Sequence, residues 1–207
     1  MLLTWFPGQE MGDAIADVLT GAREPGGRIP TTWPAHEEDV PVWQVEPVDG
    51  RLYYSEGLHV GYREWMRRAV SGGPAPAIPF GHGLGYTQWK LGDARIDTSG
   101  GDTSAASGFG VSLAVTNTGD RAGKQVVQVY LSRTSASEID RPVLWLAGFA
   151  VVHARPGQTA AAQIDVEPRA LQYWSVEEHA WRTEPGTYAV QVGTSIARLS
   201  EPIPLAV

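Results

Sequence analysis

The sequence predicts a chain of two unlike parts, the end of an α/β domain followed by an all-β sandwich of the immunoglobulin type. Residues 1–34 combine a short apolar run, a Pro-Gly break and one segment with helical spacing. Residues 35–85 are rich in proline and glycine and predict turns. Residues 86–207 alternate apolar and polar side chains in about seven short runs separated by turns, which is typical of a sandwich.

The first part, residues 1–34, predicts one strand and one helix. Residues 1–6 carry no charged side chain, and the apolar Leu2, Leu3, Trp5 and Phe6 favour a buried strand that Pro7-Gly8 ends. The next apolar side chains share one face of a helix: Ala14, Ile15, Val18 and Leu19. A strand that leads into a helix is half of a parallel βαβ unit, and parallel strands need neighbours. We therefore expect this part to close an α/β domain whose other strands lie upstream, in a larger protein.

The second zone, residues 35–85, predicts an irregular connection. Proline and glycine recur throughout it, so turns are expected along its length. Its tyrosines and tryptophans argue against disorder, because disordered segments are poor in aromatic residues. We expect an ordered segment that wraps around a neighbouring domain.

The third zone, residues 86–207, predicts the sandwich itself. The expected strands lie at 86–91, 109–115, 127–131, 143–153, 158–166, 188–192 and 199–207. In the second of these, Phe109, Val111, Leu113 and Val115 share one face and predict a buried side. The same alternation in the third strand places Tyr130 on the outward side.

Composition excludes several classes of function. The chain has 207 residues, a formal net charge of −7 and no cysteine. The negative charge argues against nucleic acid or an anionic membrane as a partner. No apolar run approaches the roughly 20 residues that span a bilayer. The five histidines lack the spacing of metal ligands, so we expect neither a metal nor another cofactor.

Five residues are candidate substrate contacts. Tyr54, Glu56, Tyr62 and Arg63 lie on the connection, and Trp5 follows the predicted parallel strand, where α/β sheets place their sites. In the alternative interpretation, Glu56 and Arg63 form an ion pair and the two tyrosines pack between domains.

Other acidic residues have simpler explanations. Glu37-Glu38-Asp39 is interpreted as a solvated acidic loop rather than a catalytic pair. Glu10 fits either the rim of a pocket or a cap of the predicted helix, whose positive end suits a carboxylate.

Several short motifs occur in a characteristic order along nearly the whole chain. They are WFPGQEMG at 5–12, ADVLTG at 16–21, EPGGRIP at 24–30, YSEGLHVGYR at 54–63, PFGHGLGYT at 79–87, VTNTG at 115–119 and VVQVYL at 126–131. Together they resemble the C-terminal part of glycoside hydrolase family 3 enzymes of the β-glucosidase type. The resemblance implies that residues 86–207 form a fibronectin type III-like domain.

The resemblance also implies where the chemistry of the parent enzyme lies. In this family a barrel carries an aspartate nucleophile, and the α/β domain carries the acid/base glutamate. A retaining glycosidase needs these two carboxyl groups about 5–5.5 Å apart. Neither the barrel nor the segment with the acid/base glutamate matches a part of this chain. Glu56-Gly57-Leu58 is not that acid/base segment, since no Asp-Arg follows it. The resemblance thus implies that the parent enzyme hydrolyses β-glucosides or related glycosides. It also implies that this chain contains no catalytic residue and that its partner domain is the missing N-terminal barrel.

A second function class remains open for the sandwich. It could serve alone as a carbohydrate-binding or scaffolding module. Exposed aromatic residues in a row on one sheet face would indicate carbohydrate binding. Tyr130, Trp174 and Trp181 do not form such a row in the sequence pattern, which favours a scaffolding role.

Overall fold

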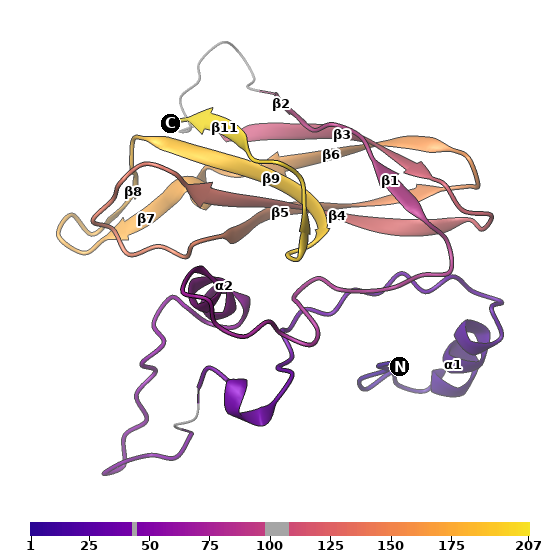
Figure 1. Ribbon diagram of the computed structural model, residues 1–207, viewed down its shortest axis with the longest axis horizontal. Helices are drawn as coiled ribbons and strands as arrows, with labels where there is room; N and C mark the ends of the chain where they lie inside the picture. The colour runs from indigo at the N-terminus through magenta and orange to yellow at the C-terminus, as the bar shows by residue number, and fades with distance from the viewer. Residues whose placement is uncertain (43–44, 98–107) are drawn as a thin grey trace.

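A computed structural model describes residues 1–42, 45–97 and 108–207, and Figure 1 shows a β-sandwich with the N-terminal third of the chain below it. The two α-helices are α1 (Met11–Leu19) and α2 (Tyr62–Val70), and the short 3₁₀ helices are η1 (Glu37–Asp39) and η3 (Pro168–Leu171). The strands of the first sheet are β1 (Trp89–Leu91), β2 (Arg95–Asp97), β3 (Phe109–Asn117) and β6 (Thr159–Val166). Those of the second are β4 (Gly123–Arg133), β5 (Trp145–Ala154), β9 (Thr187–Ser195), β10 (Arg198–Leu199) and β11 (Ile203–Ala206). A separate hairpin joins β7 (Gln172–Ser175) and β8 (Ala180–Thr183).

Two antiparallel sheets form the sandwich. In one sheet, β3 pairs with β6 on one side and with β1 and β2 at its two ends on the other. In the other sheet, β4 lies between β5 and β9, and β9 also pairs with β10 and β11. The predicted sandwich is thus confirmed, and every predicted run contains a strand. The sequence did not predict β2, β7 and β8, because alternation over three or four residues is too brief to stand out.

The main core lies between the two sheets and follows the alternation of the sequence. The four predicted β3 side chains are buried and pack with Val127, Val129 and Leu131 of β4. Ala162 and Ile164 of β6 complete this layer. Burying each large aliphatic side chain contributes about 1.5–3 kcal/mol, so this cluster is the main source of the stability of the sandwich.

Part of the outer face of the second sheet is covered as well. Tyr130 points outward as predicted, but it is completely buried. It forms a second cluster with Leu144 and Ile196, against which Tyr62 and Phe80 of the connection pack. The alternation of β4 shows which face Tyr130 occupies, whereas only the tertiary structure shows that another segment lies on it.

The predicted strand at residues 1–6 is wrong. These residues form no strand, and Trp5 and Phe6 are exposed. A strand persists only where its backbone groups pair with a neighbour, and none of the described strands lies beside this run. The predicted helix is confirmed as α1, although none of its residues is buried and Glu10 makes no side-chain cap.

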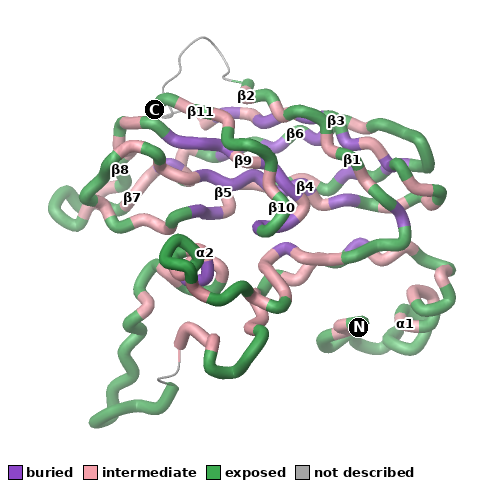
Figure 2. Tube along the Cα trace, in the orientation of Figure 1, coloured by how far each residue is buried: buried purple, intermediate pink, exposed green. Residues whose placement is uncertain are grey.

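The connection contains a helix that the sequence analysis missed. Helix α2 buries Glu64 and Trp65 toward its neighbours, and Figure 2 shows buried residues within it. The signal is present in the sequence, because Tyr62, Trp65 and Met66 have i, i+3, i+4 spacing. The flanking glycines and prolines obscured this short pattern.

The N-terminal part is attached to the sandwich through Glu24. One carboxylate oxygen of Glu24 accepts hydrogen bonds from the backbone N–H groups of Tyr86 (2.6 Å) and Thr87 (3.0 Å). Arg121 forms an ion pair with the other oxygen at 3.4 Å and also donates to the carbonyl of Gly21. These contacts fix the turn after α1 to the start of the sandwich.

Glu64 provides a test of how α2 is stabilised. Its carboxylate accepts hydrogen bonds from Arg67 (2.7 Å) and Arg68 (3.0 Å), and the Arg67 bond holds the pKa of Glu64 below its ordinary value despite burial. A lowered folded-state pKa stabilises the fold above the unfolded-state pKa, and this stabilisation is lost as pH falls through the folded value. Glu64→Gln should therefore cost about 1 kcal/mol at neutral pH and progressively less as pH falls through the lowered pKa of Glu64 in the folded state.

Urea unfolding at neutral pH and at a series of lower pH values measures this effect. Glu38→Gln is the matched control, because Glu38 is exposed on η1. A cost of Glu64→Gln that stays constant with pH would contradict the ion-pair explanation.

Candidate functional site

Tyr62 is held by aromatic packing of its ring and by a hydrogen bond to its hydroxyl group. The backbone N–H of Leu146 donates to the Tyr62 hydroxyl oxygen at 2.9 Å. The ring lies 4.6 Å from the ring centre of Phe80 and meets Tyr130 edge-on at 6.3 Å. Burial raises the pKa of the Tyr130 hydroxyl, which donates to Gln128 at 2.6 Å. In this chain, therefore, the surroundings of Tyr62 fasten the connection to β4 and β5.

Glu56 and His59 lie in the turn that precedes α2. The backbone N–H of His59 donates to the backbone carbonyl of Glu56 at 2.9 Å. The ring nitrogen Nε2 of His59 lies 3.1 Å from the carboxylate of Asp140. Glu56 Oε2 and His59 Nδ1 are both enclosed, and neither has a hydrogen-bond partner among the described residues. A buried carboxylate oxygen without a partner is unusual, because leaving it unpaired costs free energy.

The ion pair between Glu56 and Arg63 does not form in the part of the chain that the structure describes. Arg63 instead lies over the Tyr62 ring at 5.9 Å and makes a long hydrogen bond of 3.4 Å to the carbonyl of Leu58. This guanidinium group is therefore available to another carboxylate.

The remaining two candidates are exposed and lie apart. Tyr54 is 76% exposed on the extended loop before α2, and Trp5 is 54% exposed near the N-terminus. Figure 1 shows the N-terminus beside α1, on the opposite side of the molecule from that loop. The structure thus gathers Glu56, Tyr62 and Arg63 around the start of α2, whereas Trp5 is separate from them.

No metal centre is formed by residues 1–42, 45–97 and 108–207, which contain no group of three or more His, Asp or Glu side chains that could hold an ion. Glu37, Glu38 and Asp39 lie in η1, and Glu37 and Glu38 are exposed. Among the described helices, none is long and apolar enough to cross a membrane.

A cleft of about 450 Å³ lies where the start of α2 meets the sandwich. Leu58 and Arg63 form one side, the loop 139–142 lies beside them, and the β7–β8 hairpin forms the other side. Trp174 and Trp181 face each other across the hairpin with ring centres 5.5 Å apart. Sequence analysis noted these tryptophans but did not place Arg63 near them.

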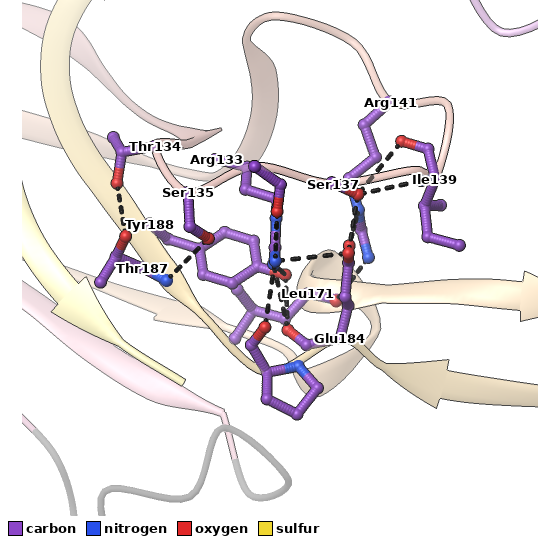
Figure 3. A network of polar contacts seen from close by, with 12 residues as sticks. Arg133, Thr134, Ser135, Ser137, Ile139, Arg141, Leu171, Glu184, Thr187 and Tyr188 are labelled. Atoms are coloured by element: carbon purple, nitrogen blue, oxygen red, sulfur yellow. Dashed lines mark hydrogen bonds and ion pairs between the residues drawn. The ribbon is translucent and has the colours of Figure 1, made fainter.

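Arg141 also lines this cleft and is held by several contacts. Arg141 lies over the rings of Trp145 (5.9 Å) and Tyr173 (5.6 Å), and its Nε donates to Glu184 at 3.1 Å. Figure 3 shows Glu184 between Arg141 and Arg133, with the hydroxyl of Ser137 also directed at the carboxylate. One carboxylate thus serves two enclosed guanidinium groups.

Comparison with known families finds two matching domains in the chain. Residues 1–62 match the glycosyl hydrolase family 3 C-terminal domain, and residues 125–196 match the fibronectin type III-like domain. The second match lies within the sandwich, which agrees with the predicted domain type.

Individual relatives support the same assignment. A β-glucosidase of Rhizobium radiobacter is 40% identical over 200 residues, which cover 94% of this chain and 24% of that protein. A β-glucosidase of Kluyveromyces marxianus is 39% identical over 207 residues and is covered to 22%. The chain therefore spans about a quarter of the length of the curated relatives that it matches.

Solved structures show that the architecture is shared. The β-glucosidase of Streptomyces venezuelae, solved in complex with D-glucose, superposes on 98% of this chain with a TM-score of 0.87 and 32% identity, and 25% of that protein is covered. A Bifidobacterium adolescentis family 3 β-glucosidase gives a TM-score of 0.88 over 99% of this chain, at 32% identity and with 29% of that protein covered. On the evidence of its motifs, its two matched domains and these superpositions, the chain belongs to glycoside hydrolase family 3 and corresponds to the C-terminal part of its β-glucosidases.

Proposed function

We propose that this chain acts as the C-terminal part of a retaining β-glucosidase that hydrolyses terminal β-D-glucosyl residues. The observation that carries the proposal is the 40% identity to the Rhizobium radiobacter β-glucosidase over a continuous quarter of that enzyme. In this proposal, the nucleophile and the acid/base group lie in the remaining three-quarters. Retaining hydrolysis needs both carboxyl groups on opposite sides of the scissile bond.

The proposal assigns a role to each of the three predicted parts of the chain. Residues 1–34 would close the α/β domain, residues 35–85 would connect it, and residues 86–207 would form the sandwich. The apolar side chains exposed at the N-terminal end, such as Trp5 and Phe6, support this arrangement, because a partner domain would remove them from water. The sandwich then serves as the scaffold against which the connection is fixed.

Activity measurements on the chain and on a chimera test the proposal. The isolated chain should not hydrolyse p-nitrophenyl β-D-glucoside above the buffer rate. A chimera in which residues 1–207 replace the matched quarter of the Rhizobium radiobacter enzyme should regain turnover. The same enzyme truncated before that quarter is the control and should remain inactive. Turnover by the isolated chain, abolished by changing one of its carboxylates, would overturn the proposal.

Within this proposal, Tyr54, Glu56 and Arg63 are candidate contacts near the substrate, and Trp5 is a more distant one. The enclosed and unpartnered Oε2 atom of Glu56 supports a contact that the isolated chain does not provide. Tyr62 is the weakest of the five, because its hydroxyl and ring are already engaged.

Glu56→Gln in the active chimera tests this assignment. A supporting hydrogen bond to the substrate predicts about a tenfold fall in kcat/KM, or roughly 1.4 kcal/mol, with a nearly unchanged melting temperature. Glu177→Gln, on an exposed turn of the sandwich, is the control and should change neither quantity. A lower melting temperature with unchanged kinetics would instead make Glu56 a structural residue.

A further inference from the structure

The cleft between the start of α2 and the β7–β8 hairpin has the dimensions of a ligand site. Its volume of about 450 Å³ falls within the roughly 300–1,000 Å³ typical of pockets for small molecules. A space of this size accommodates one or two sugar rings.

One wall of the cleft offers flat aromatic surface. Trp174 and Trp181 are cross-strand partners of the hairpin and remain 46% and 43% exposed. Their edge-to-face arrangement, with an angle of 67° between the planes, fixes both rings. A rigid and partly exposed indole face can receive the apolar C–H face of a pyranose ring while the hydroxyl groups of the sugar remain in water.

The charges of the cleft select an anion. The charged side chains that line it are Arg63, Arg141, Arg169 and Asp140, which sum to +2 in a chain whose net charge is −7. Arg141 forms an ion pair with Glu184, and Asp140 is in contact with the ring of His59. Within the described part of the chain, neither Arg63 nor Arg169 forms an ion pair.

Arg169 is oriented for binding by the same aromatic wall. Its guanidinium carbon lies 3.8 Å from the ring centre of Trp181. A cation–π contact of this kind holds the plane of the guanidinium while its N–H groups stay free to donate. A planar guanidinium matches a carboxylate with two parallel hydrogen bonds.

We propose that this cleft binds a saccharide that carries a carboxylate, a uronic acid unit whose ring lies on Trp174 and whose carboxylate faces Arg63 and Arg169, the latter held on Trp181. The proposed function concerns neutral glucosides bound by the longer enzyme. The cleft shares Arg63 with its candidate contacts, but binding of the acid by the isolated chain does not depend on that function. The isolated chain is sufficient for the test.

Titration of the ¹⁵N-labelled chain with cellobiouronic acid and with cellobiose tests the proposal, because the two disaccharides differ in one carboxylate. We expect the acid to bind at least tenfold more tightly, to shift the indole N–H signals of Trp174 and Trp181, and to bind more weakly as salt is added. The Trp5 signal should not move. Inorganic phosphate and a triglutamate peptide are the comparison anions and should displace the acid at least tenfold less effectively.

Variants decide which groups are responsible. Arg169→Gln and Trp174→Ala should each weaken binding of the acid at least tenfold, while Trp5→Ala leaves it unchanged. Arg63→Gln changes the opposite wall of the cleft and should also weaken binding of the acid. This variant tests the proposal even if a substitution in the hairpin disturbs the folding of the hairpin. Equal affinity for cellobiose, equal displacement by phosphate or triglutamate, or no change in the two indole signals would each overturn the proposal.

Discussion

Replacing Glu184 by glutamine is expected to lower the free energy of unfolding by about 3–5 kcal/mol, because the change removes one partner from an enclosed ion network. Glu184 forms ion pairs with Arg133 at 3.3 Å and with Arg141 at 3.1 Å. The side chains of these two arginines are only 9% and 10% exposed. Without the carboxylate, both positive charges would remain buried close to each other.

The rest of the network does not compensate for this loss. Arg133 also donates to the carbonyls of Glu184 and Pro185 and to the Tyr188 hydroxyl, as Figure 3 shows. These neutral acceptors hold the arginine in place but leave its charge unpaired. The variant should therefore lose stability without losing the register of β9.

Chemical denaturation at neutral pH measures the effect, and an exposed pair supplies the control. Glu178 and Arg182 form an ion pair on the hairpin with both side chains 49% exposed. Glu178→Gln should cost less than about 1 kcal/mol, because solvent screens such pairs. A similar cost for both substitutions would show that enclosure adds nothing at Glu184. The double variant Arg133→Met with Glu184→Gln should recover part of the loss.

The sandwich could be predicted from the sequence because the pattern that defines its longer strands lies within each strand. Alternation in β3 places one side of the strand in the core, and the same residues are buried in the structure. The short strands β7 and β8 carry no comparable pattern, since only pairing with each other defines them. The prediction of a strand at residues 1–6 failed for a different reason. The apolar pattern is present there, but an apolar run becomes a strand only beside a suitable neighbour.

The cleft could not be predicted because its residues meet only in the tertiary structure. Arg63 precedes Arg169 by more than half of the chain, and the hairpin register alone brings Trp174 opposite Trp181. Likewise, no sequence pattern relates Tyr62 to Tyr130. The candidate site residues were chosen for their place on an aromatic connection, and the sequence did not indicate which side chains they contact.

Tyr130→Ala is expected to release the connection from the sandwich. The Tyr130 side chain is completely buried on the outer face of β4, where it packs against Tyr62 and Phe80. Truncation of a buried aromatic residue costs about 3–5 kcal/mol. Because the main core lies on the other face of β4, this cost should fall on the docking of residues 56–85 rather than on the sandwich.

Leu131→Ala is the matched control, because Leu131 is the next residue of β4 and is equally buried, but in the main core. It should destabilise the whole sandwich by about 2–5 kcal/mol and leave the connection docked until global unfolding. Hydrogen exchange followed by proteolytic fragmentation separates the two outcomes. In Tyr130→Ala, amides of α2 should exchange much faster while those of β3 and β6 keep their protection. Uniform acceleration in both variants would show instead that the connection and the sandwich unfold as one unit, and that the two faces of β4 are not energetically separable.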